Sequence, residues 1–67
     1  MSEADRRQVQ EVLHRLDYYQ GAIDGKFGAL TRAAIRRFQD SISVKRTGYL
    51  TAAEATRLAS TQAGARD

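Results

Sequence analysis

The chain contains no cysteine and a single histidine among its 67 residues, and this limits most strongly how it can fold. Neither a disulfide nor a zinc site built from Cys and His ligands can hold it together. A domain of this size buries only ~60% of the surface of its unfolded chain, so its stability depends on one well-packed core. Most apolar side chains are therefore needed for packing, and thiol chemistry is excluded.

The apolar residues of the first segment recur at helical spacing. Ser2 is suited to begin a helix as its N-cap, because a serine hydroxyl accepts a hydrogen bond from a free backbone N–H group. Residues 17–21 end this helix, and the last of them is a glycine. One face of the predicted helix is formed by Val9, Val12, Leu13 and Leu16.

Three glycines punctuate the segment 21–28, where Asp24 and Gly25 indicate a tight turn. Ile23 and Phe27 are large apolar residues within this loop. We expect both to fold back onto the core.

Two further helices follow this loop. The second is predicted from just after Gly28 to about Ser41, with an apolar stripe formed by Leu30, Ala34, Ile35, Phe38 and Ile42. Thr51 and Glu54 have the spacing of a capping box, in which each side chain accepts a hydrogen bond from a free N–H group at a helix start. They predict a third helix that ends near Ser60.

Because no segment alternates as a strand does, the sequence predicts an all-α fold. We expect a compact three-helix bundle with a structured glycine-rich loop between the first two helices. Residues 1–60 form this single domain, and residues 61–67 are expected to be a flexible tail. The predicted core comprises Val9, Val12, Leu13, Leu16, Ile23, Phe27, Ala34, Ile35, Phe38, Ile42, Val44, Leu50 and Leu58.

Eleven Lys and Arg residues against eight Asp and Glu residues give a net charge of +3, a mild preference for anionic partners. No apolar run approaches the ~20 residues of a membrane span, so we expect no membrane partner. The polar residues after Met1 do not form a signal peptide, which suggests a domain taken from a longer protein.

Three motifs at defined spacing resemble those of the type 1 peptidoglycan-binding domain, a three-helix module attached to bacterial cell-wall hydrolases. They are Asp24-Gly25-x-Phe27-Gly28, Thr31-x-x-Ala34-Ile35-x-x-Phe38-Gln39 and Thr47-Gly48-x-Leu50-Thr51, within a match over residues 9–58. The chain departs from this family at Asp17, where glycine is usual, and at Ala29, where proline is frequent. Asp17 must adopt a left-handed conformation or end the helix differently.

The resemblance implies binding to the glycan strand or stem peptide of peptidoglycan, without catalysis and without a cofactor. The domain would then target an attached catalytic domain or a partner protein to the wall. It would act as a monomer in the periplasm or cell wall.

The candidate ligand residues combine polar, aromatic and cationic side chains: Tyr18, Tyr19, Asp24, Thr31, Arg32, Arg36 and Gln39. We expect a groove beside the loop 18–27 and the start of the second helix. Most of these residues also have a structural interpretation. Asp24 can cap the second helix, Gln39 can hold a neighbouring loop, and one tyrosine of the pair 18–19 is expected to be buried. Tyr49 is a third aromatic candidate, and Arg37, Lys45 and Arg46 can extend the cationic face.

Two other functions remain open. A protein-interaction module with the same fold is compatible with the motifs, since these consist mainly of core and turn residues. A helix-turn-helix nucleic-acid binder fits less well, because the linker 41–50 is long and Arg57 is the one basic residue of the third helix. The acidic residues are too scattered to predict a hydrolytic acid–base pair, and His14 stands alone, so neither hydrolysis nor a metal site is predicted.

Overall fold

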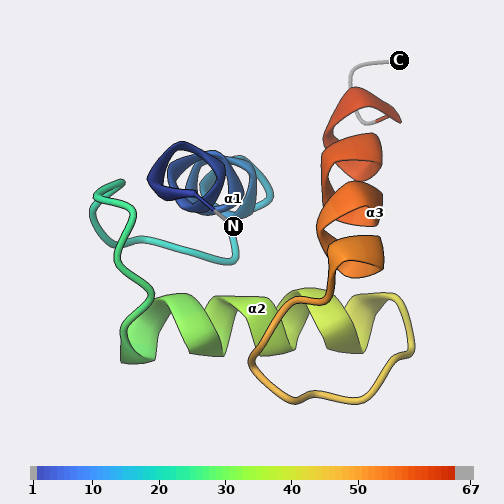
Figure 1. The fold of residues 1–67 in the computed structure, drawn as a ribbon. Helices are drawn as coiled ribbons and strands as arrows, with labels where there is room; N and C mark the ends of the chain where they lie inside the picture. The colour runs from blue at the N-terminus through green and yellow to red at the C-terminus, as the bar shows by residue number, and fades with distance from the viewer. Residues whose placement is uncertain (1, 65–67) are drawn as a thin grey trace.

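The computed structural model describes residues 2–64, which form three helices: α1 (Glu3–Arg15), α2 (Ala29–Ser41) and α3 (Ala52–Gly64). Figure 1 shows their axes crossing steeply, with α1 seen end-on and α2 lying beneath both α1 and α3. The predicted all-α fold of three helices is confirmed. The loop before α2 joins one end of this helix, and the loop after it leaves from the other end and runs back beneath the helix to α3.

Helix α1 begins and ends as the sequence predicts. Ser2 and Asp5 form a reciprocal capping box at its start. At its end, the Tyr18 N–H donates to the Leu13 carbonyl and the Asp17 N–H donates to the His14 carbonyl, the pattern of a Schellman motif. Asp17 has φ 66°, so it adopts the left-handed conformation for which glycine is usual.

Helix α2 begins at Ala29, and its N-cap residue is Gly28, which has no side chain with which to cap the helix. The interpretation of Asp24 as the cap of this helix was therefore wrong. The helix ends in a second Schellman motif, in which Ser43 has φ 60° and the Val44 N–H donates to the Gln39 carbonyl.

Helix α3 begins with the predicted capping box. The Glu54 N–H donates to Thr51 Oγ1 (3.1 Å), and the Thr51 N–H donates to Glu54 Oε1 (3.2 Å). The helix runs to Gly64, so its predicted end near Ser60 was wrong. Residues 65–67 of the predicted tail lie outside the part of the chain that the structure describes.

The core lies where the three helices meet, and it consists of Val9, Val12, Leu13, Tyr19, Ala34, Ile35, Phe38 and Leu58. Five half-buried residues pack against it: Leu16, Tyr18, Phe27, Ile42 and Leu50. As expected, one tyrosine of the pair is buried and the other is partly exposed.

Three apolar residues that were predicted to pack inward do not join the core. One of them, Val44, is half-buried but is not among the residues that pack against the core. Ile23 is 39% exposed and Leu30 is 70% exposed. Leu30 belongs to the helical stripe of Ile35 and Phe38, but it lies in the first turn of α2. The stripe is covered only further along the helix, where α1 and α3 pack against it.

Candidate functional site

The predicted ligand residues fall into two groups in the structure. The side chains of Tyr19, Thr31 and Gln39 are buried, whereas Asp24, Arg32 and Arg36 are exposed, and Tyr18 is half-buried. Since a ligand reaches exposed groups first, the buried side chains are better suited to roles inside the molecule.

The buried amide of Gln10 organises the first loop. Gln10 Oε1 accepts hydrogen bonds from the N–H groups of Asp24 (3.0 Å) and Gly25 (2.8 Å). Gln10 Nε2 donates to the Lys26 carbonyl (2.9 Å) and to Thr31 Oγ1 (3.1 Å). We refer to Gln10, Asp24, Gly25, Lys26 and Thr31 as the first glutamine node.

The buried amide of Gln39 organises the second loop in the same manner. Gln39 Oε1 accepts a hydrogen bond from the Gly48 N–H (3.0 Å). Gln39 Nε2 donates to the Tyr49 carbonyl (2.9 Å) and to Glu54 Oε1 (3.1 Å), and it also lies 3.2 Å from Thr47 Oγ1. We refer to Gln39, Thr47, Gly48, Tyr49 and Glu54 as the second glutamine node.

The turn in each node has a glycine with a positive φ, 76° at Gly25 and 81° at Gly48. The side chain before each glycine accepts a hydrogen bond from the N–H group after it, at 2.9 Å for Asp24 and 3.2 Å for Thr47. These bonds lie at the surface and fix the backbone of each turn. Thr31 and Gln39 thus have internal roles, and so does Asp24.

The carboxylate of Asp24 is fixed in its charged form by this turn. The Lys26 N–H donates to it, and this bond, with the nearby Gln10 amide, lowers the pKa of Asp24 below its usual value. Tyr19 is fixed nearby, because its hydroxyl donates to the Ala22 carbonyl (2.6 Å).

A different arrangement lies beside the second node, on the exposed face of α2. The guanidinium of Arg32 lies over the ring of Tyr49, with 4.9 Å between the Arg32 Cζ atom and the ring centroid. Arg36, one helical turn further on, covers Gly48: a Cβ atom built on Gly48 would lie 3.2 Å from Arg36 Nε. We call Arg32, Arg36 and Tyr49 the arginine shelf.

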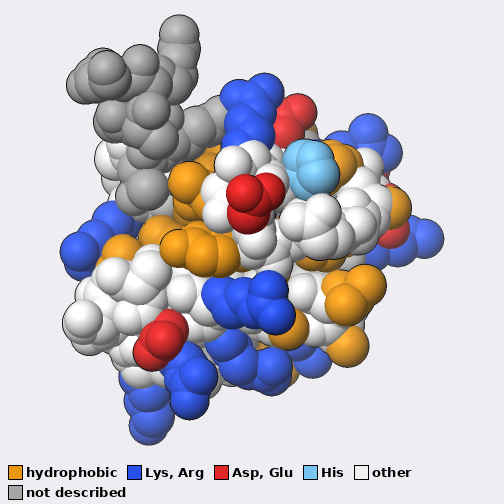
Figure 2. Space-filling view, turned by 180° about the vertical axis from the view of Figure 1, so that it is seen from behind, with side chains coloured by type: hydrophobic (Ala, Val, Ile, Leu, Met, Phe, Trp, Pro, Cys, Tyr) orange, Lys and Arg blue, Asp and Glu red, His pale blue; other side chains and the backbone are white. Residues whose placement is uncertain are grey.

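Charges are distributed unevenly between the helices. Both ion pairs found among the described residues lie within α1, Glu3–Arg7 (3.0 Å) and Glu11–Arg15 (3.7 Å). On α2 and the loop after it, five cations have no ion-pair partner within residues 2–64: Arg32, Arg36, Arg37, Lys45 and Arg46. Figure 2 shows Lys and Arg side chains gathered along the lower part of the molecule, where α2 lies.

Two unpaired guanidinium groups one turn apart suit an anionic ligand. A guanidinium presents several N–H donors in a plane that matches a carboxylate, and its contact with an aromatic ring restricts its orientation. Tyr49 is 61% exposed, so its ring is also accessible. Within residues 2–64, no cluster of His, Cys, Asp and Glu has the arrangement of a metal site.

Sequence reasoning overlooked Gln10 and left Tyr49 out of the selected site residues. A signal for Gln10 was present in the repeated pairing of a core residue with glutamine, Val9-Gln10 and Phe38-Gln39. Tyr49 follows the turn glycine, and its exposure depends on how the second loop folds. No helix in the described part of the chain has the length and apolar character needed to cross a membrane.

Comparison with known families gives one match. A family model described as "Putative peptidoglycan binding domain" matches residues 2–58. No curated protein and no solved structure gives a significant match. The match covers both glutamine nodes and the whole arginine shelf.

Proposed function

Because the chain belongs to the peptidoglycan-binding domain family, we propose that it binds bacterial peptidoglycan through the arginine shelf without cleaving it. The groups bound there are the carboxylates of the stem peptides. The domain thereby holds an attached or partner protein at the wall, outside the cytoplasmic membrane.

The observation that carries this proposal is the pair of guanidinium groups of the shelf. Arg32 rests on the Tyr49 ring and Arg36 on Gly48, so both side chains are partly ordered before a ligand arrives. Ordering side chains in advance lowers the entropy that binding must offset. The neighbouring unpaired cations add long-range attraction for a polyanionic wall.

The chemistry of the shelf favours binding over cleavage. A guanidinium stays protonated at neutral pH, so it donates hydrogen bonds but does not exchange protons with a substrate. Cleavage of a glycosidic bond uses a pair of carboxyl groups placed on either side of that bond. An anion held between Arg32 and Arg36 would be fixed in position and left unchanged.

The test is sedimentation with purified, insoluble peptidoglycan sacculi. We expect the wild-type protein to pellet with the sacculi at low salt and to be released as salt is raised, since salt screens exposed charges. A variant with both Arg32→Gln and Arg36→Gln should remain in the supernatant. The control variant, with Arg7→Gln and Arg15→Gln, removes the same charge from α1 and should still pellet.

Chemical amidation of the carboxyl groups of the sacculi should weaken wild-type binding in the same way. If the wild-type protein stays in the supernatant while a known wall-binding module pellets, the proposal is wrong. The alternative of a protein-interaction module would then become the better account.

A further inference from the structure

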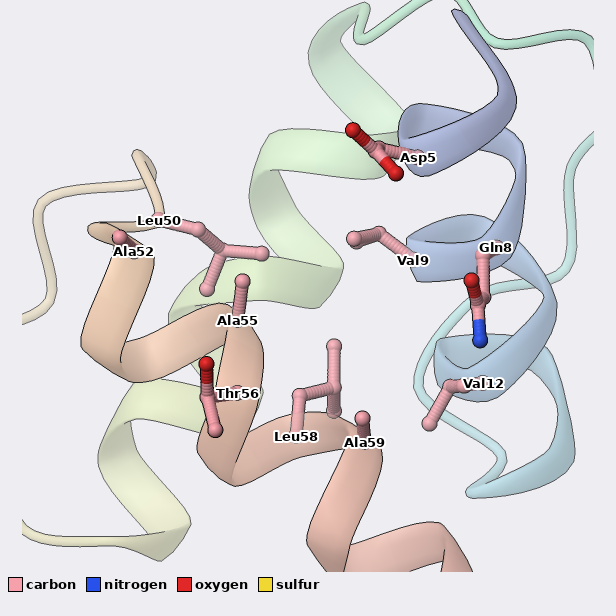
Figure 3. A pocket seen from close by; sticks show the side chains of 10 residues that line it. All are labelled: Asp5, Gln8, Val9, Val12, Leu50, Ala52, Ala55, Thr56, Leu58 and Ala59. Atoms are coloured by element: carbon pink, nitrogen blue, oxygen red, sulfur yellow. The ribbon is translucent and has the colours of Figure 1, made fainter. Parts of the chain in front are cut away.

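A groove that none of the arginine-shelf residues line lies between α1 and α3. Its volume is about 500 Å³, within the ~300–1,000 Å³ of typical ligand sites. Figure 3 shows Val9 and Val12 of α1 facing Ala55, Leu58 and Ala59 of α3 across it. None of the predicted ligand residues lines it.

The lining of this groove is apolar with a few polar groups at its edge. Alanine methyl groups from α3 form one wall, and valine side chains from α1 form the other. Asp5, Gln8 and Thr56 supply the polar groups. No aromatic ring lines the groove, so it lacks the flat surface against which a sugar ring packs well.

Asp5 lies at the end of the groove that is nearer to Leu50 (Figure 3). Its carboxylate accepts a hydrogen bond from the Ser2 N–H (3.0 Å), and this bond lowers the pKa of Asp5, which therefore remains ionised. Asp5 forms no ion pair within residues 2–64. An exposed negative charge beside an apolar groove is complementary to a ligand that combines small apolar groups with an ammonium group.

We infer that the groove between α1 and α3 binds the stem peptide of peptidoglycan, with its alanine methyl groups against the alanine wall and the amine of its diamino residue beside Asp5. This inference rests on the proposed function and assigns a second part of the ligand to a second surface. Leu50 of the groove directly follows Tyr49 of the arginine shelf in the sequence, so the chain links the two surfaces. Carboxylates bind at the shelf, and the apolar and cationic parts of a stem bind in the groove.

The experiment is a titration of the isotope-labelled protein with a soluble stem tetrapeptide, L-alanyl-γ-D-glutamyl-L-lysyl-D-alanine, followed by backbone amide NMR shifts. We expect the largest shifts at Val9, Val12, Ala55 and Ala59. The same peptide with its lysine amine acetylated should bind more weakly. An N-acetylglucosamine tetramer should leave these amides unchanged.

Variants inside and outside the groove provide the matched controls. Ala59→Leu fills the groove and should weaken peptide binding by about tenfold or more, whereas Ala53→Leu, on the same helix outside the groove, should not. The Asp5→Asn variant should bind the unmodified tetrapeptide only as strongly as the wild type binds the acetylated one. Glu11→Gln, which removes the same charge elsewhere on α1, should have no such effect.

The inference is overturned if the tetrapeptide does not bind, if its shifts lie outside the groove, or if a folded Ala59→Leu variant binds it as the wild type does. Sedimentation with sacculi separates this failure from failure of the proposed function. If the wild-type protein pellets but shows no tetrapeptide shifts in the groove, the proposed function stands and the stem-peptide site is wrong.

Discussion

Gln10 and Gln39 each hold a glycine turn with the same pattern of hydrogen bonds, but the two turns face different surroundings. In both nodes the glutamine oxygen accepts from the turn glycine, and the glutamine nitrogen donates to the next carbonyl. The nitrogen also donates to a side chain six residues after the glycine, Thr31 or Glu54.

The first turn packs against the start of α1. The Gly25 carbonyl accepts from Arg6 Nε (2.7 Å), and a Cβ atom on Gly25 would lie only 2.8 Å from Glu3 Cγ. The second turn instead leads to the surface, where Tyr49 is exposed beneath Arg32. The comparison suggests that the first node holds the fold together and that the second also positions a binding surface.

The largest effect should come from Gln10→Leu, which removes the centre of the first node. The N–H groups of Asp24 and Gly25 lose their partner, at roughly 1–3 kcal/mol for each buried group left unsatisfied, and the Lys26 carbonyl keeps only its bond from the Gly28 N–H. That total is comparable to the whole stability of a small domain. Circular dichroism should show loss of the cooperative thermal transition, while Gln8→Leu, at an exposed position of the same helix, should melt like the wild type.

A smaller effect is expected from Gln39→Leu, because its oxygen accepts from one backbone N–H group rather than two. We expect a loss of roughly 1–3 kcal/mol. The variant should remain folded at low temperature but pellet poorly with sacculi, since Gly48 and Tyr49 lose the contact that positions the shelf. If it unfolds as completely as Gln10→Leu, the two nodes do not differ as described.

Glycine substitutions at the C-terminal ends of α1 and α2 should raise the stability of the fold. Asp17 and Ser43 adopt left-handed conformations, which cost non-glycine residues roughly 1–2 kcal/mol. Asp17→Gly and Ser43→Gly should each stabilise the fold by about 0.5–1 kcal/mol, since glycine adopts this conformation readily but orders at a greater entropic cost. Thermal melts of the single and double variants should show additive gains, and an unchanged midpoint would contradict this account.

The smallest expected difference is in the response to acid. Because the pKa of Asp24 is lowered in the folded protein, its contribution to stability is present above the unfolded value of 3.8 and is lost as the pH falls through the folded value. The corresponding residue of the second node, Thr47, has a hydroxyl that does not titrate in this range. Asp24→Asn should therefore melt with a shallower loss of stability below about pH 4 than the wild type.

Asp5 also has a lowered pKa, so the Asp24→Asn variant should keep part of the acid dependence. A variant with the same acid dependence as the wild type would show that the Asp24 carboxylate does not stabilise the first turn.

Local patterns predicted much of the fold. The apolar stripes predicted the helices, and the spacing of Thr51 and Glu54 predicted a capping box. For Asp17 two alternatives were open, and the structure shows the left-handed one. The expected role of Gln39 in holding a loop also agrees with its hydrogen bonds. Apart from the Gln39 hydrogen bonds, which join residues 9 and 10 positions apart, each of these depends on residues that are close in the sequence.

What could not be predicted depends on how the helices cross. Gln10 forms hydrogen bonds with residues 9 to 21 positions away, and no periodicity links them. Leu30 has the spacing of a core residue, but the crossing of α1 over α2 leaves it exposed. The groove between α1 and α3 likewise exists only because alanine side chains of α3 meet α1 at a distance that the sequence does not specify.

The central claim is that peptidoglycan carboxylates bind at the second turn and not at the first. The most direct measurement is a titration of the labelled protein with soluble disaccharide–peptide fragments, in which backbone amide shifts and the Arg32 and Arg36 side-chain signals are followed. The account predicts shifts at Gly48, Tyr49 and both arginines, with Gly25 and Lys26 unchanged. Shifts at Gly25 and Lys26, with the shelf unchanged, would contradict it.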